Sequence, residues 1–274
     1  MPPRSADPAR VVAIAALVAL ASVFLLALGQ SGVAAPDRID GAASAAQPAV
    51  RQPGQVSDVR DATKFEIGCG WPEARVAASG APRVSVGSTT IYAGTAQVTS
   101  NNQDPRLVRF DDGVETWCRS DIETTGDDHR GYGLLWDGAD RLLMAISVTG
   151  TQGTPDQDLR RVARDGWLRS YTDASTGGGG PKASIVVAVD PSSGDPTRAT
   201  YVTARLSNGR VNSLTVTAMA FRGEEIIVDV SSFFSPRRAD RTPMQCSGSS
   251  PFDVRYVFSS ELDAVSDVAS PRCR

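Results

Sequence analysis

The chain has 274 residues, of which 41% are hydrophobic, and a formal net charge of −3. This length allows one sizeable domain with its own core. Acidic and basic residues are interspersed, and the lack of a basic stripe excludes nucleic acid as an expected partner.

The first predicted element is an uncharged apolar segment, residues 11–29, which follows Arg10. At about 1.5 Å per helical residue, a segment of this length just crosses a hydrocarbon core, so we expect a membrane to be its partner. Arg4 and Arg10 predict that the short N-terminus stays inside the cell and that the remainder is exported. A cleavable signal peptide fits as well, with small residues at 27–29 and 32–34, so a cell-membrane anchor and a secreted chain both remain open.

Residues 30–63 are rich in Ala, Pro, Gln and Ser and follow neither a helical nor a strand period. This composition predicts a flexible linker. The predicted organisation is therefore a signal peptide or anchor at 1–29, a linker at 30–63 and an extracytoplasmic β domain at 64–274.

All four cysteines, Cys69, Cys118, Cys246 and Cys273, lie beyond the apolar segment. An even number of cysteines in an exported domain favours disulfides, and three pairings are possible. We predict Cys69–Cys118 and Cys246–Cys273, each within one end of the domain, with four free thiols as the alternative. The spacings lack the clustering of a zinc site, so we expect no metal and no other cofactor.

Beyond residue 64 the apolar pattern is that of β-strands. Residues 211–220 and 252–258 alternate, and their even-numbered positions from Leu214 and Phe252 onward are expected to face a sheet interface. Residues 142–148 and 185–189 are continuous apolar runs, which are typical of strands buried on both faces.

Two kinds of strand pair alternate along this region and give about three four-stranded antiparallel units, each of about 60 to 80 residues. One kind occurs at 107–119, 184–204 and 252–264, and the other at 83–97, 132–149 and 213–232. A period of this size predicts an all-β, propeller-like stack of sheets, preceded by the one N-terminal membrane or signal helix.

Residues 104–151 carry a further pattern of turn and packing residues: Phe110, Asp111, Gly113, Trp117, Gly126, Asp128, Gly133, Asp137 and Gly150. The pattern resembles the seven-bladed β-propeller-type repeats of exported bacterial proteins. The resemblance implies a fold and no activity. Propellers typically have about 4–8 blades, so three units imply extra strands from 65–85, closure by the final strands, an open fan or a ring shared by two chains. The oligomeric state stays open.

Residues 150–181 interrupt the strand pattern. A capping box at 154–157 predicts a short helix that ends at Gly166. Trp167 and Tyr171 follow, before a run of glycines. We consider two roles for this insertion, a ligand-binding loop and a plug at the end of the β core.

Asp127, Asp128 and His129 are the chemical candidates. A histidine beside carboxylates suits a general base, but the chain has no Gly-x-Ser-x-Gly nucleophile motif, and the segment reads as a solvated turn. Together with Asp111 and Asp112 these aspartates offer oxygen ligands for calcium, although Asp-Gly turns explain them without metal. We therefore predict no catalytic and no metal site. The candidate binding residues are Trp167, Tyr171, Asp127, Asp128 and His129.

The function expected from these features is a non-catalytic β module, tethered or secreted, that binds a protein or a glycan at the cell envelope. The alternatives are an exported hydrolase or lyase on a propeller-like scaffold and a purely structural envelope protein.

Overall fold

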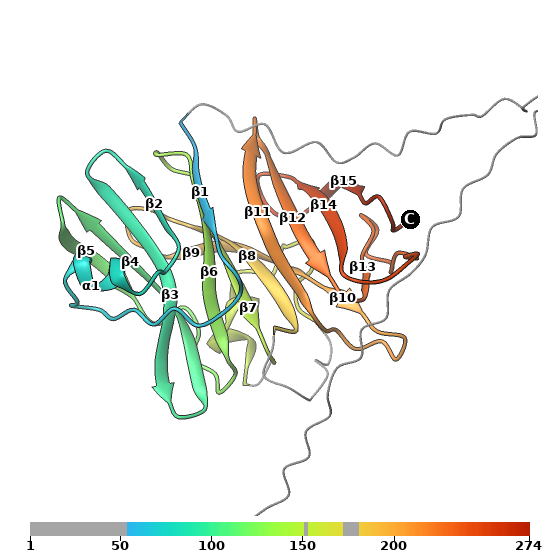
Figure 1. The fold of residues 1–274 in the computed structure, drawn as a ribbon, viewed down its shortest axis with the longest axis horizontal. Coiled ribbons are helices and arrows are strands. Elements are labelled where there is room, and N and C mark those ends of the chain that lie inside the picture. Colours follow the sequence, from blue (N-terminus) through green and yellow to red (C-terminus); the bar gives the residue numbers. More distant parts are fainter. Residues whose placement is uncertain (1–53, 151–152, 172–180) are drawn as a thin grey trace, which may run out of the picture. The chain divides into compact units, whose positions relative to one another are not determined.

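The computed structural model describes residues 54–150, 153–171 and 181–274, which form an all-β structure, as predicted (Figure 1). The strands form several antiparallel sheets, none of which closes on itself. The predicted membrane segment 11–29 and most of the linker 30–63 lie outside the described residues. Within the described ranges, no helix is long and apolar enough to cross a membrane.

Three main sheets follow one another along the chain. The first sheet has the strand order β2-β3-β4-β5, the central sheet β1-β6-β7-β8-β9 and the third sheet β11-β12-β14-β15, while β10 and β13 form a two-stranded ribbon. The elements are β1 (Val56–Val59), α1 (Glu73–Ala78), β2 (Arg83–Val86), β3 (Thr89–Thr99), β4 (Asn102–Asp111), β5 (Val114–Arg119), β6 (His129–Trp136), β7 (Leu142–Val148), η1 (Pro155–Gln157), η2 (Leu159–Arg161), β8 (Ala183–Val189), β9 (Pro196–Val202), β10 (Ala204–Arg205), β11 (Leu214–Arg222), β12 (Glu225–Ser232), β13 (Ser235–Pro236), β14 (Phe252–Phe258) and β15 (Val265–Ala269). The three sheets correspond to the three units expected from the sequence.

The central sheet has one strand more than expected, because β1 lies within the range predicted as linker. β1 pairs with β6 from Val56–Trp136 to Val59–Gly133, and its four residues are half-buried at the sheet edge. An edge strand of four residues is too short for an alternation of apolar and polar residues to be recognised in the sequence. The folded domain therefore begins before residue 64, which corrects the expected boundary.

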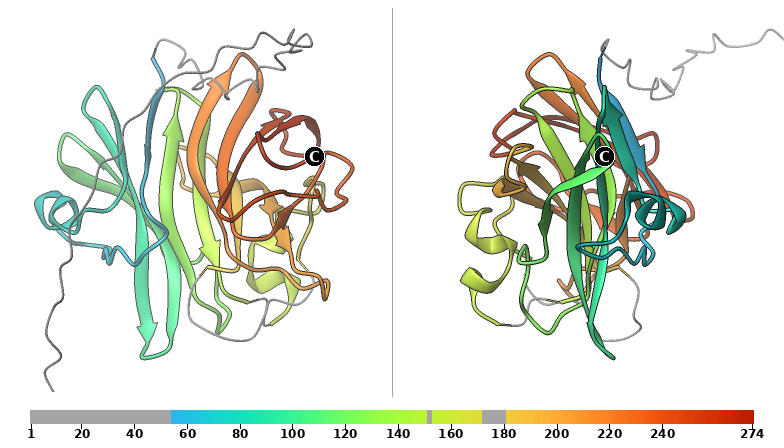
Figure 2. Two further views of the ribbon diagram at one scale, coloured as in Figure 1. Left: turned by 45° about the vertical axis from the view of Figure 1, so that its right-hand side comes forward. Right: turned by 90° about the vertical axis from the view of Figure 1, so that its left-hand side faces the viewer.

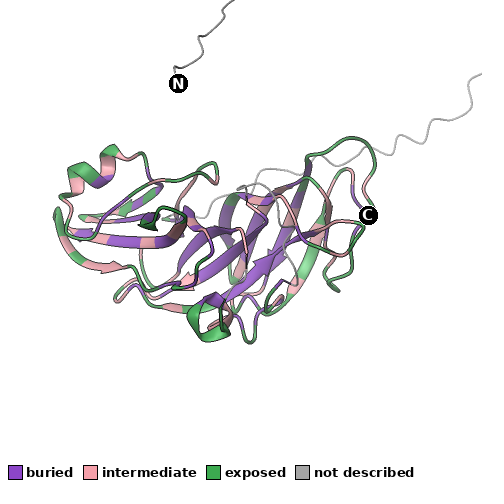
Figure 3. Ribbon diagram, turned by 90° about the horizontal axis from the view of Figure 1, so that it is seen from below, coloured by how far each residue is buried: buried purple, intermediate pink, exposed green. Residues whose placement is uncertain are grey.

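The central sheet lies between the other two and is covered on both faces (Figures 1 and 2). Leu107 of the first sheet and Met144 of the central sheet belong to one core, and Val186 of the central sheet and Val228 of the third belong to another. All of β7 and nearly all of β8 are buried, so the prediction from their continuous apolar runs is confirmed (Figure 3).

The third sheet confirms one predicted register and corrects the other. In β14 the even-numbered residues from Phe252 to Phe258 are buried in the core, as expected. In β11 a β-bulge follows Val216, and beyond it Met219 continues the core stripe while Ala220 packs on the outer face. The prediction that Ala220 shares the core face is wrong, because the bulge inserts one residue and reverses the alternation.

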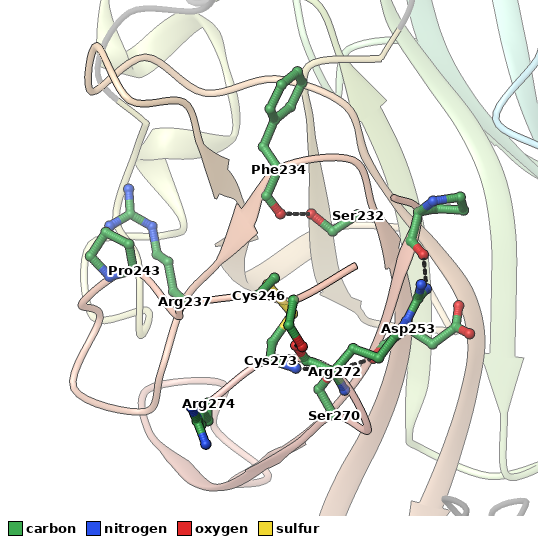
Figure 4. Close-up of a disulfide and its surroundings, with 12 residues drawn as sticks. Ser232, Phe234, Arg237, Pro243, Cys246, Asp253, Ser270, Arg272, Cys273 and Arg274 are labelled. Carbon is green, nitrogen blue, oxygen red and sulfur yellow. Dashed lines mark hydrogen bonds between the residues drawn. A yellow bond between two sulfur atoms is a disulfide. The ribbon is translucent and has the colours of Figure 1, made fainter. Parts of the chain in front are cut away.

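Both predicted disulfides are confirmed. Cys69 bonds to Cys118 of β5, and Cys246 bonds to Cys273 (Figure 4), with Cα–Cα distances of 5.5 and 4.0 Å. No cysteine remains free. Two disulfides indicate an oxidising, extracytoplasmic environment.

The insertion after β7 forms two 3₁₀ turns instead of one helix. The capping box at 154–157 is present and begins η1, but Asp158 is extended and separates it from η2. Residues 172–180, which include the glycine run, lie outside the described residues.

Candidate functional site

Two of the three chemical candidates from the sequence, Asp127 and His129, lie inside the protein. His129 is the first residue of β6 and only 1% exposed, and Asp127 is 5% exposed. The expectation of a solvated turn at His129 is wrong, because the β6–β7 ladder extends as far as the pair His129–Val148. The imidazole ring of His129 therefore lies in the core.

His129 meets two carboxyl groups that the sequence did not identify. Its Nδ1 lies 3.2 Å from Oε2 of Glu123, and the two side chains are 1% and 0% exposed. The other oxygen of Glu123 accepts a hydrogen bond from the backbone N–H of Thr125. Asp104, near the start of β4 in the first sheet, is 5% exposed and close enough for the charges of Glu123 and His129 to act on it.

Protons are distributed unusually over these three groups. Burial and the neighbouring Glu123 raise the pKa of Asp104 to about 7. Burial opposes a charged His129, but the Glu123 carboxylate outweighs it and raises the pKa of His129. Burial likewise opposes a charged Glu123, yet His129 holds the pKa of Glu123 below its usual range. At mildly acidic pH the site is therefore an imidazolium–carboxylate pair beside a protonated Asp104.

Two buried tyrosines extend the cluster. The rings of Tyr171 and Tyr201 lie 5.6 Å apart, and neither phenol oxygen has a hydrogen-bond partner in the described part of the chain. Burial, followed by the neighbouring tyrosine, raises the pKa of Tyr171, and the charge of Asp127 acts in the same direction. The structure thus brings Tyr171 close enough to Asp127 for the charge of Asp127 to act on it, although the two are far apart in the sequence.

The remaining candidates, Trp167 and Asp128, make other contacts. Trp167 is 2% exposed, packs against Tyr256 and Phe258, and donates its indole N–H to the carbonyl of Ala239. It therefore plugs the core between the central and third sheets. Asp128 lies 3.6 Å from the guanidinium of Arg130.

A histidine–carboxylate pair activates nucleophiles in many hydrolases. Asp104, Glu123 and His129 are at most 5% exposed, so a substrate reaches their reactive atoms only if the fold opens. Within residues 54–150, 153–171 and 181–274, no group of three His, Cys, Asp or Glu side chains is arranged to hold a metal ion.

An accessible cleft of about 700 Å³ lies at one end of the central and third sheets. The β6–β7, β8–β9, β11–β12 and β14–β15 turns supply its walls. Its charged lining residues are Asp140, Arg141, Asp190, Arg198, Glu224 and Glu261. Leu142 and Ile226 add apolar surface, so the cleft presents both hydrogen-bonding and apolar groups.

Arg141 is the most distinctive group in the cleft. Its guanidinium lies 3.9 Å from the centre of the Phe221 ring, and Nη1 donates to the carbonyl of Gly223 at 2.7 Å. Nη2 is buried and has no hydrogen-bond partner among the described residues. An unpaired buried donor costs about 1–3 kcal/mol, so the Arg141 side chain gains if it shifts to bring this N–H to an acceptor in the cleft.

The sequence identified the cleft segments only as turns. Residues 137–138, 190–194 and 222–223 carry ordinary turn signals, and nothing in them marks a site. The one usable signal is topological. In an antiparallel meander alternate turns fall at the same end of the sheet, so these turns collect at one end of the stack.

No family model matches the chain, and no curated protein matches it either. The likeness to propeller-type repeats therefore rests on residues 104–151 alone, and the function is inferred from the geometry of the site.

Proposed function

We propose that this protein is a non-catalytic extracytoplasmic binding module whose cleft, at the turn end of the central and third sheets, holds a glycan of the cell envelope. The observation that carries the proposal is an open cleft of about 700 Å³ whose lining combines charged side chains, Arg141 among them, with apolar ones. This volume falls in the range of about 300–1,000 Å³ that small-ligand sites occupy.

The lining favours a glycan over a protein partner. Asp140 and Glu224 offer acceptors for hydroxyl groups, Arg141 offers a donor, and Leu142 and Ile226 offer apolar contact to the faces of sugar rings. A stable protein interface needs a broad surface, about 800 Å² per partner, rather than a single cleft between turns.

The chain's location supports the same class of function. The two disulfides favour an oxidising compartment, and the apolar segment 11–29 favours either a membrane anchor or a signal for secretion. The enclosure of His129 and Glu123 favours binding over the alternative of an exported hydrolase or lyase.

We also infer that the stack is an open, propeller-like fan. Each main sheet is formed mostly by an antiparallel meander and packs face to face with the next. The repeat-like segment 104–151 spans the end of the first sheet and the start of the central one, which is the span of a repeat that links two blades.

The test is glycan binding by the purified chain, measured by calorimetry with soluble fragments released from the cell envelope of the source organism. We expect R141A to weaken binding at least about tenfold, because a hydrogen bond to a charged group contributes about 1.5–3 kcal/mol. R222A is the matched control, since Arg222 lies outside the cleft lining and pairs with Glu225 at 2.8 Å.

R141K keeps a positive charge near Phe221 but lacks the guanidinium group. If its unfolding midpoint equals that of the wild type, any loss of binding comes from the missing guanidinium and not from a loss of the fold. We expect R141K to bind weakly as well. Equal affinities for R141A and R222A would overturn the proposal. Turnover of the fragments would instead support the hydrolase or lyase.

A further inference from the structure

The end of the third sheet opposite the cleft carries a cluster of arginines. Strand β11 begins there and β12 ends there, next to the β10–β13 ribbon (Figure 1). Backbone pairing in and around the β10–β13 ribbon, together with hydrogen bonds to main-chain oxygens, brings six residues together, which we call the arginine cluster: Arg205, Arg210, Arg237, Arg238, Arg241 and Arg274. No ion pair found within the described ranges involves any of the six.

Hydrogen bonds to backbone carbonyls hold the cluster together. Arg237 donates to the carbonyl of Arg241 at 2.9 Å, and Arg238 donates to that of Arg274 at 2.6 Å. Burial and then the neighbouring charge of Arg205 lower the pKa of Arg237, which shows that the two guanidinium groups repel each other. Figure 4 shows Arg237 and Arg274 on the same side of the Cys246–Cys273 disulfide. An anionic partner would offset this repulsion.

The acid within the same hairpin does not neutralise the cluster. Asp240 lies in the same hairpin, where it accepts hydrogen bonds from the backbone N–H and the hydroxyl of Thr242. The hydroxyl and then the N–H of Thr242 lower the pKa of Asp240, so it is ionised at neutral pH. Asp267 lines the same hollow as Arg238 and Arg274, so two carboxylates stand against six guanidinium groups and the surface keeps a net positive charge.

An exposed aromatic side chain accompanies the arginines. Phe233 is 52% exposed and connects β12 to β13, and its backbone N–H donates to the carbonyl of Ser213 at 3.0 Å. Arg205 pairs with Ser235, two residues further along the chain. Phe233 therefore protrudes beside the cationic surface from a backbone position that is fixed.

We infer that the arginine cluster and Phe233 dock on the surface of an anionic phospholipid bilayer. Arginine side chains are attracted to an anionic leaflet, and an exposed apolar ring enters the headgroup region. A soluble anionic polymer would need the charges alone, so Phe233 favours the bilayer. The cleft, at the other end of β11, would then face away from the membrane.

The inference is tested with the full chain incubated with bilayers that carry brominated acyl chains, which quench tryptophan on contact. Phe233→Trp places the reporter in the proposed contact, and Val114→Trp is the matched control, because Val114 is 69% exposed on the first sheet. The emission of the unmodified chain is subtracted from both. We expect quenching of F233W in bilayers rich in phosphatidylglycerol, little in pure phosphatidylcholine, and none for V114W in either.

The charge requirement is tested by adding R210E and R241E to F233W, since both arginines are exposed and lie at turns. We expect quenching to fall to the level seen in phosphatidylcholine, and 0.5 M salt to have the same effect on the unaltered cluster, which keeps the test valid if the double variant folds poorly. Equal quenching of F233W in both lipids would overturn the inference. So would binding of dextran sulfate without quenching in anionic bilayers, which would indicate a polymer partner instead.

Discussion

At the scale of single residues, the most consequential group is the buried trio of Asp104, Glu123 and His129. Charged and protonated side chains coexist in this trio because each group shifts the pKa of its neighbours. His129 was a candidate from the sequence, but neither of its two carboxyl neighbours was predicted. Asp104 belongs to the first sheet and Glu123 to a loop before β6, so only tertiary packing brings them to the imidazole.

This trio predicts that stability falls as the pH rises from 5 to 8. The pKa of Asp104 is about 7 in the folded protein, far above that of an unfolded aspartic acid, so the folded state retains a proton that the unfolded chain loses. His129, whose pKa is also raised, contributes stability that is lost as the pH rises through its folded-state pKa. Urea unfolding should show a loss of roughly 2–4 kcal/mol across this range.

D104N provides the control, because an amide does not titrate, and should remove at least half of this pH dependence. D111N is matched to it. The hydrogen bond from Arg109 lowers the pKa of Asp111 to about 2, so that group is ionised throughout the range and its substitution should leave the slope unchanged. A wild-type stability that rises from pH 5 to 8 would contradict the assigned protonation states.

At the scale of elements, the prediction from sequence was good where the alternation was uninterrupted and failed where the backbone departs from it. β14 has a regular ladder with β12, and its inward face could be identified in advance. β11 could not be treated in the same way, because the bulge after Val216 leaves no signature in its run of small and polar residues. β1 escaped notice because half of its four residues are polar.

Strand β14 therefore allows a sharp test by two adjacent substitutions. Tyr256 is fully buried and its hydroxyl bonds the backbone of Arg237, so Y256A should cost about 3–5 kcal/mol. Arg255 lies on the opposite face and pairs with Asp229 at 2.7 Å, so R255A should cost about 1 kcal/mol or less. Urea midpoints that place the two in the reverse order would show that the register of the third sheet is incorrect.

At the scale of the whole described domain, three chemically distinct features lie in three different places in the stack of sheets. The titratable groups are enclosed, the cleft opens where four turns meet, and the arginine cluster lies at the opposite end of β11. The all-β class, the antiparallel units and the disulfide pairing could be predicted from period and composition. The cleft could not be predicted, because its residues carry only turn signals in the sequence and form a cleft only through the packing of two sheets.

The central claim is that the cleft is the binding site, and hydrogen exchange tests it most directly. The purified chain would be compared with and without the soluble envelope glycan fragments. We predict that protection increases at residues 138–142, 189–192 and 222–226, while residues 112–114 in the β4–β5 turn stay unchanged. Added protection confined to surfaces outside the cleft, or none at saturating fragment concentration, would contradict the proposed site.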